Sequence, residues 1–167
     1  MKIFLMAFPS FLSVACSSAD PVAALEDSNK SVRERYSDVI FLTTTELANK
    51  LEQAVPLLLI DVRAPKEFRV SHLPGAHNAP KPSKHFADTP RDTLIVVYCS
   101  IGVRSARAAQ QLQALGFSNV YNLEGSIFQW ANEDRPVVGS EGPASGVHPF
   151  NRYWGRFLKP EHWQWKP

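Results

Sequence analysis

The feature that most constrains the fold of this chain is a regular alternation of short apolar runs with helical stretches over residues 37–137. The strongest run, at residues 94–98, reads Leu-Ile-Val-Val-Tyr, and residues 57–61 form a second continuous run. Runs of this kind suit strands that are buried on both faces of a parallel sheet. Their alternation with helices predicts an α/β fold with a central, mainly parallel sheet flanked by helices.

Local signals place the remaining elements around these two strands. Thr43 or Thr44 can cap a helix, and Glu46 stands at capping-box spacing from Thr43. Gly116 follows a run with apolar residues at helical spacing and is a C-cap signal. We therefore expect further strands at residues 39–42 and 120–121, and helices starting near residue 44 and at residues 105–115 and 127–131.

Composition excludes several classes of protein. The chain has 18 basic and 16 acidic residues, a net charge of +2, and no basic stripe, so nucleic acid is not an expected partner. Its two cysteines are too few for a disulfide scaffold or a four-cysteine zinc site. The histidines lack metal-like spacing, and we expect no metal. Those interpreted as surface residues are His77, His85, His148 and His162.

The first residues have the pattern of an export signal. Lys2 precedes an uncharged, mostly apolar run, and residues 1–15 are predicted to be a signal peptide. Residues 12–16, Leu-Ser-Val-Ala-Cys, resemble the lipobox of bacterial lipoproteins, in which the cysteine is acylated. That resemblance implies lipidation of Cys16 and a periplasmic protein anchored in the bacterial envelope. An ordinary secretory signal and a short buried helix are the alternatives.

Two segments outside the alternating region differ from it in composition. Residues 16–36 are polar and are interpreted as a tether between an anchor and a globular body. Residues 138–167 read as a Gly/Pro linker followed by an aromatic-rich tail, which holds three of the four tryptophans. The tail has three interpretations: it packs back over the domain, lies at a membrane interface, or docks a protein partner.

Cys99 is the candidate catalytic residue. It directly follows the strongest strand and precedes a short loop that leads into a helix, the place where open parallel sheets bind ligands. Loop N–H groups and the helix dipole at such a position lower a thiol pKa and favour the thiolate. Gly102 permits a tight cradle, and Arg104 adds positive charge. The alternative is that Cys99 is merely a small buried apolar residue.

Three groups of residues resemble the signature of the rhodanese (sulfurtransferase) domain over residues 38–137. Residues 98–105, Tyr-Cys-Ser-Ile-Gly-Val-Arg-Ser, resemble the active-site loop of that family. The C-terminal third resembles residues 115–130, with Leu-Gly-Phe, Asn-Val-Tyr, Leu123, Gly125 and Trp130. The first part resembles Asp61-Val62-Arg63, Glu67-Phe68, His72-Leu73-Pro74-Gly75-Ala76 and Asn78.

This resemblance implies a rhodanese-like fold and an enzyme that carries sulfane sulfur as a Cys99 persulfide. The sulfur would come from a small donor such as thiosulfate or a persulfide and pass to a thiol or cyanide, with no cofactor. Arg63 is implied to face the anion together with Arg104, and Asp61 to give structural support. The implied substrate-binding loop consists of Ser100, Ile101, Gly102, Val103 and Arg104.

Departures and spacing refine this expectation. Ser100 stands where many members of the family have arginine, which removes one anion ligand, and Ser71 replaces a glycine in what is expected to be a surface turn. Four residues separate Cys99 from Arg104, whereas the related cysteine-dependent phosphatases need five, so phosphatase activity is disfavoured. The main alternative is a non-catalytic rhodanese-like module at the cell envelope that binds a partner or senses redox state. Thiol–disulfide exchange is disfavoured because no second cysteine lies near Cys99 in the sequence.

Overall fold

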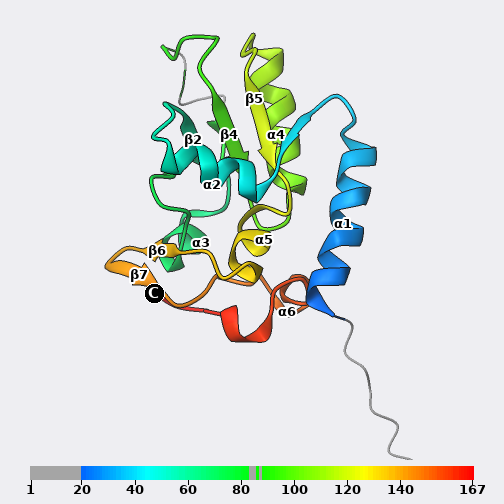
Figure 1. The fold of residues 1–167 in the computed structure, drawn as a ribbon, viewed down its shortest axis with the longest axis vertical. Coiled ribbons are helices and arrows are strands. Elements are labelled where there is room, and N and C mark those ends of the chain that lie inside the picture. Colours follow the sequence, from blue (N-terminus) through cyan, green and yellow to red (C-terminus); the bar gives the residue numbers. More distant parts are fainter. Residues whose placement is uncertain (1–19, 83–85, 87) are drawn as a thin grey trace, which may run out of the picture.

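The computed structural model describes residues 20–82, 86 and 88–167. Its centre is a five-stranded sheet in the order β1-β5-β4-β2-β3, in which every pair of neighbours is parallel (Figure 1). The predicted α/β fold with a parallel sheet flanked by helices is therefore confirmed. The strands are β1 (Ile40–Leu42), β2 (Leu58–Asp61), β3 (His77–Asn78), β4 (Ile95–Tyr98) and β5 (Val120–Leu123).

The central strand β4 has apolar side chains on both faces, as its sequence predicts. Val96 and Tyr98 belong to the cluster that contains α2 (Thr44–Glu52) and α5 (Ser126–Asn132), whereas Ile95 and Val97 belong to the cluster that contains α4 (Val103–Ala114). Successive side chains of a strand point to opposite faces, so one run of four residues contributes to both layers. All four are fully buried.

Six α-helices surround the sheet in the described part of the chain (Figure 1). Thr43 and Glu46 form the predicted capping box at the start of α2, with Thr43 N donating to Glu46 Oε2 at 2.8 Å. The expected strands and helices are all present with ends shifted by a few residues, while α3 and β3 had not been predicted. The helices are α1 (Pro21–Arg35), α2 (Thr44–Glu52), α3 (Pro65–Val70), α4 (Val103–Ala114), α5 (Ser126–Asn132) and α6 (Arg152–Gly155).

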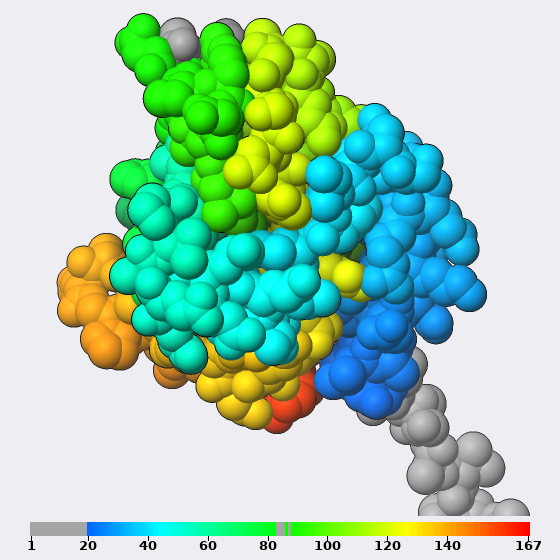
Figure 2. All heavy atoms as spheres, turned by 45° about the horizontal axis from the view of Figure 1, so that its top comes forward, coloured from blue at the N-terminus to red at the C-terminus, as the bar shows by residue number. Residues whose placement is uncertain are grey.

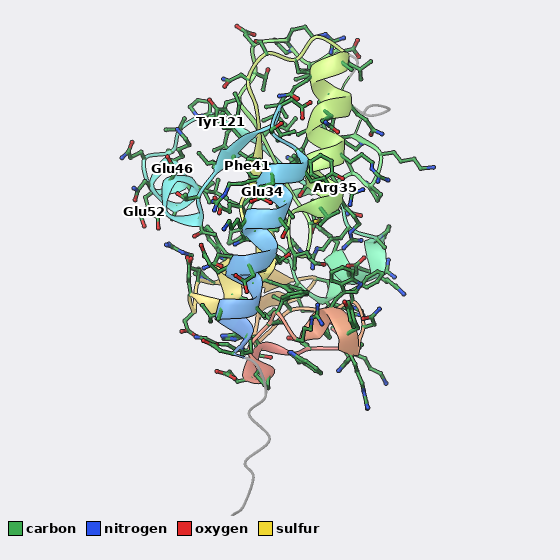
Figure 3. The ribbon with its side chains drawn as sticks, turned by 90° about the vertical axis from the view of Figure 1, so that its right-hand side faces the viewer. Glu34, Arg35, Phe41, Glu46, Glu52 and Tyr121 are labelled. Atoms are coloured by element: carbon green, nitrogen blue, oxygen red, sulfur yellow. The ribbon has the colours of Figure 1, made fainter. Side chains whose placement is uncertain are left out.

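Helix α1 corrects the interpretation of residues 16–36 as a polar tether. From Asp20 onward this segment is ordered as a helix, capped by Asp20, that lies along the domain and leads into β1 (Figure 3). Leu25, Asn29 and Val32 are buried against the body. Their spacing of four and three residues puts them on one face of a helix, which is enough to dock an otherwise polar segment.

The C-terminal segment is also folded. Residues interpreted as a linker form an antiparallel hairpin of β6 (Val137–Gly139) and β7 (Gly142–Ala144). The aromatic tail packs back over the domain, the first of its three interpretations, and buries Val147, Phe157 and Leu158 in the cluster beneath α5. Figure 2 shows the hairpin in orange at the edge of the molecule, and Figure 1 shows the C-terminus beside β7. A 3-10 turn, η2 (Pro160–His162), follows α6.

The predicted signal peptide at residues 1–15 and the predicted lipidation site Cys16 lie outside the described residues. In the part of the chain that the structure describes, no helix has both the length and the apolar character that crossing a membrane requires.

Candidate active site

Cys99 lies at the carboxyl end of β4, directly before the loop that opens α4. Its side chain is only 1% exposed, and it is the single free cysteine among the described residues. The Sγ atom accepts a hydrogen bond from Gly102 N at 3.2 Å and one from Ser105 Oγ at 3.5 Å. Gly102 has a φ of +97°, a value at which other residues are strained, so the tight return of the loop toward the sulfur requires glycine.

The carbonyl groups of the loop point away from the sulfur. Cys99 O accepts from Ile127 N at 3.2 Å, and Ser100 O accepts from Phe128 N at 3.1 Å, both at the start of α5. Because a trans peptide places its N–H opposite its C=O, these contacts turn the N–H groups of Ser100 and Ile101 toward the interior of the loop. The first N–H groups of α4 also lack acceptors within the helix. The loop is therefore built to surround an anion with donors.

Two polar residues, one in β5 and one at the start of α5, hold the loop in place, and sequence reasoning missed both as site residues. Asn122 Nδ2 donates to Gly102 O at 3.0 Å. Ser126 Oγ accepts from Cys99 N and donates to Leu123 O, each at 3.1 Å. The available signal was a fully buried asparagine inside the apolar strand β5, a position where a polar side chain needs a specific partner.

Arg104 is fixed over the loop by a buried carboxylate. Its guanidinium donates to Glu67 Oε1 at 2.9 Å and to Glu67 Oε2 at 3.1 Å, and Nη2 also donates to Ser100 Oγ at 3.0 Å. Glu67 has no exposed side-chain surface and also accepts from Ala64 N, which caps α3. The guanidinium thus has a fixed position but shares its charge with a carboxylate.

The electrostatics of the site favour the thiolate. Burial raises the pKa of Cys99. The positive charge of Arg104 and hydrogen bonds from Ser105 and the Ile101 amide lower this pKa by more than burial raises it, so the net pKa lies below the ordinary value of a thiol. For Arg104, burial acts to lower the pKa, while Glu67 and Cys99 raise it above its usual range and keep the guanidinium charged. A permanent cation beside a buried thiol is the arrangement that makes cysteine nucleophilic.

The prediction that Arg63 faces the bound anion is wrong. Arg63 is fully buried and contacts Asp61 through Nε at 3.0 Å and through Nη2 at 2.7 Å, while Nη2 also donates to Ser71 O at 2.6 Å. All its described contacts lie beneath the surface, and it does not line the cavity at Cys99. Asp61 and Arg63 together tie the end of β2 to the turn after α3. Ser71, expected in a surface turn, is fully buried there.

The other expected loop residues, except Gly102, come together around one cavity of about 220 Å³ at Cys99. The loop and the start of α4 contribute most of its lining, and the C-terminal segment contributes the rest through Phe150 and Trp154. Neither residue was predicted as part of the site. The full lining consists of Cys99, Ser100, Ile101, Val103, Arg104, Phe150 and Trp154.

Histidines take no part in a metal centre within the described residues, where no group of three or more His, Cys, Asp or Glu side chains is placed to hold an ion. His72 Nδ1 lies 2.9 Å from Phe68 O, and its ring stacks on that of Phe68. His148, interpreted as a surface residue, is buried, and its Nδ1 accepts from Phe150 N at 3.0 Å.

Comparison with known proteins gives a consistent match to one family. The family model described as the rhodanese-like domain matches residues 43–133. A sulfurtransferase of Allochromatium vinosum is 33% identical over 104 residues, which cover 60% of this chain and 96% of that protein. The probable adenylyltransferase/sulfurtransferase MoeZ of Mycobacterium tuberculosis is 38% identical over 99 residues, which cover 57% of this chain but only 25% of that protein.

Solved structures agree with this match. Thiosulfate sulfurtransferase from Pseudomonas aeruginosa has a TM-score of 0.55 and 30% identity, over 60% of this chain and 20% of that chain. The BH2092 protein from Bacillus halodurans has a TM-score of 0.57 at 22% identity, over 69% of this chain and 88% of that one, and shows likeness of fold alone.

Proposed function

The chain belongs to the rhodanese-like domain family, and on that premise we propose that it is a sulfurtransferase that carries sulfane sulfur as a persulfide of Cys99. The observation that carries the proposal is the surrounding of Cys99 Sγ: a thiol of lowered pKa that faces N–H donors of the loop and the side chain of Arg104. The named relatives that are sulfurtransferases support the same reaction class.

In the first half-reaction the Cys99 thiolate attacks the outer sulfur of a donor, and the donor's sulfur–sulfur bond breaks. With thiosulfate as donor, sulfite leaves with the bonding electron pair and Cys99 becomes a persulfide anion. The number of negative charges is the same on both sides of this step. The N–H groups of Ser100, Ile101 and the start of α4 would stabilise the new terminal sulfur anion, as an oxyanion hole stabilises oxygen.

In the second half-reaction an acceptor takes the outer sulfur. Cyanide or a thiolate attacks this atom, the persulfide bond breaks, and Cys99 leaves as the thiolate in which it began. The products are thiocyanate or the persulfide of the acceptor thiol. The cation of Arg104 favours the thiolate as a leaving group because it stabilises negative charge on Sγ.

The test is intact-protein mass spectrometry of the full chain carrying Cys16→Ser, which leaves Cys99 as its one thiol. Incubation with thiosulfate or methanethiosulfonate should add one sulfur atom, and subsequent cyanide should remove it and yield thiocyanate. The same protein with Cys99→Ser should gain nothing. If no donor loads Cys99, the catalytic proposal fails, and a binding or redox-sensing role at this cavity becomes the better explanation.

We also propose that the protein is exported and held at the bacterial envelope by a lipid on Cys16. The support is the apolar run of residues 1–15 and the lipobox-like sequence that ends in Cys16. Expression of the full chain in a bacterial host should place it in the membrane fraction, from which detergent but not high salt releases it. Cys16→Ser should move it out of that fraction, and an unchanged distribution would contradict lipidation.

A further inference from the structure

The cavity above Cys99 has one wall that the rhodanese-like match does not include. Phe150 and Trp154 line it from a segment that lies beyond residue 133, where the family match ends. Ile101 and Val103 of the loop and helix α4 also line it. The cavity is therefore lined by four apolar side chains besides Cys99, half of them from the C-terminal segment.

The C-terminal segment is fixed in place by contacts with the rest of the domain. Asn132, at the end of α5, donates from Nδ2 to Phe157 O and accepts at Oδ1 from Lys159 N, each at 2.9 Å. Leu158 between them is fully buried. The ring of Trp163 lies so close to Gly155 that an added side chain would meet it at 2.6 Å. Helix α6, which carries Trp154, is thus held from both sides.

Phe150 occupies its position at a conformational cost. Its φ is +66°, and Asn151 N donates to Pro149 O at 2.8 Å, which closes the strained, positive-φ form of the γ-turn around it. Its own N–H is bound by His148 Nδ1 at 3.0 Å. A bulky residue in this backbone region persists only where the surroundings determine it, and such positions cluster at ligand sites. The ring remains 43% exposed, beside the cavity.

The charge of the cavity does not suit a small dianion. Among the residues that line it, Arg104 is the one cation, and its charge is shared with the buried carboxylate of Glu67. The face of the Arg104 guanidinium is further covered by the Phe150 ring, 5.3 Å from its centroid. Besides the N–H donors of the loop, a doubly charged donor would find only one cationic side chain here, and the charge of that side chain is partly neutralised.

We propose that Phe150 and Trp154 form an apolar subsite for the leaving group of the sulfur donor, so that the site prefers donors with an aryl or alkyl substituent to inorganic thiosulfate. This inference rests on the proposed sulfurtransferase function. In the step concerned, the Cys99 thiolate attacks the outer sulfur of an organic thiosulfonate, the sulfur–sulfur bond breaks, and a sulfinate leaves with the electron pair. An organic persulfide reacts in the same way, with a thiolate as the leaving group.

The experiment compares benzenethiosulfonate, methanethiosulfonate and thiosulfate as donors to the full chain carrying Cys16→Ser. The kcat/KM for transfer to cyanide is divided by the rate constant of each donor with glutathione alone, which removes differences in intrinsic reactivity. After this correction, benzenethiosulfonate should exceed methanethiosulfonate by about tenfold and thiosulfate by more, in line with the value of burying an aromatic group.

Variants locate this preference in the two rings. Phe150→Ala and Trp154→Ala should each lower the ratio of benzenethiosulfonate to methanethiosulfonate by about three- to tenfold. Phe150→Leu should restore part of it. Leu115→Ala is the control, since Leu115 is also an exposed apolar residue, 46% exposed, and does not line the cavity, and it should leave the ratio unchanged. Thermal unfolding of each variant verifies that it is folded.

The outcomes separate the two proposals. If all three donors load Cys99 with equal corrected rates, or if neither Phe150→Ala nor Trp154→Ala changes the ratio, the subsite is refuted while the sulfurtransferase function stands. If no donor loads Cys99, both proposals fail. A ratio that falls in the two cavity variants and not in Leu115→Ala supports the subsite.

Discussion

The two walls of the cavity above Cys99 are built by different means. On the sheet side, hydrogen bonds from Asn122, Ser126 and the start of α5 fix the loop, and the ion pair of Glu67 fixes Arg104. From the C-terminal segment, aromatic rings supply surface and few polar groups. On the two proposals above, the first wall would provide what sulfur transfer needs of any donor, while the second would contact only the part of the donor that varies. Reactivity and selectivity would then reside in separate parts of the chain and could be changed separately.

The largest effect is expected from the sulfur atom itself. Cys99→Ser should lower sulfur transfer to cyanide by at least about 1,000-fold, to the background of the reagents, because no other group at the site can hold the sulfur. The fall should be equally deep for benzenethiosulfonate and thiosulfate. Initial rates of thiocyanate formation measure it. A residual activity that still distinguishes the donors would mean that the aromatic wall acts without Cys99.

The next effect concerns the polar construction beneath the loop. Asp61→Asn removes the counter-charge of the buried Arg63. The Nη1 atom of Arg63 already lacks a hydrogen-bond partner among the described atoms, so this arginine has little other compensation. Breaking a buried pair of this kind costs about 3–5 kcal/mol. Urea unfolding should show that loss of unfolding free energy. Asp38→Asn, at an exposed aspartate paired with Gln110, is the matched control and should cost less than about 0.5 kcal/mol.

The residues behind these first two effects differ in how well the local sequence predicted their positions. The run Leu-Ile-Val-Val-Tyr before Cys99 and the glycine after it predicted the strand, the turn and the position of the thiol, because each is determined within a few residues. The burial of Arg63 was missed because it depends on Ser71 and on the packing of β2 against its neighbours. The local sequence around a basic residue does not distinguish a side chain that lines an anion site from one that is buried beneath that site.

The sequence analysis included packing of the aromatic tail over the domain, but it missed the β6–β7 hairpin, the position of Phe150 and Trp154 at the cavity, and α1, for a related reason. Glycine, proline and serine at residues 138–146 suggested a linker, yet the hairpin there is held by pairing of His72 with Val138, far away in the sequence. Phe150 reaches the site only because α5 anchors the segment that follows it. The aromatic content did indicate that this was no ordinary disordered tail. It could not indicate which surface the rings would cover.

A third, smaller effect is a change in pH dependence on the sheet side of the cavity. The rate of Cys99 loading follows the thiolate fraction, so it should rise with pH and level off above a pKa lower than that of an ordinary thiol. Arg104→Gln removes the cation that lowers this pKa, so the inflection should move to higher pH. Loading at neutral pH should then fall several-fold, while the rates at high pH converge.

Arg107→Gln is the control for this shift, since Arg107 is exposed on the same helix and does not line the cavity above Cys99. Its pH profile of loading, measured with methanethiosulfonate, should match that of the unmodified protein. Circular dichroism verifies that Arg104→Gln stays folded despite the buried Glu67 it leaves unpaired. An unmoved inflection in Arg104→Gln would assign the lowered pKa to the hydrogen bonds from Ser105 and the loop N–H groups.

The smallest expected effect comes from the residue that joins the two walls. Asn132 lies inside the region matched by the rhodanese-like domain, yet both polar atoms of its amide bind the C-terminal segment, at Phe157 O and Lys159 N. These two bonds do not reach any residue that lines the cavity, so Asn132 acts as a positioning residue. Asn132→Ala should cost about 1–3 kcal/mol of unfolding free energy and loosen α6 against the domain.

A merely structural role for Asn132 would lower the activity toward every donor equally, whereas a positioning role has a distinct signature. Loosening α6 should raise KM for benzenethiosulfonate by about two- to fivefold, with little change for thiosulfate, because only the aryl group uses the wall that moves. Limited proteolysis should cut residues 137–163 faster in the variant. Asn119→Ala, at a half-buried asparagine whose side chain makes one long bond to Asp92 O at 3.4 Å, should change neither measurement. Equal loss toward both donors would mean that the C-terminal segment stabilises the domain without shaping its choice of donor.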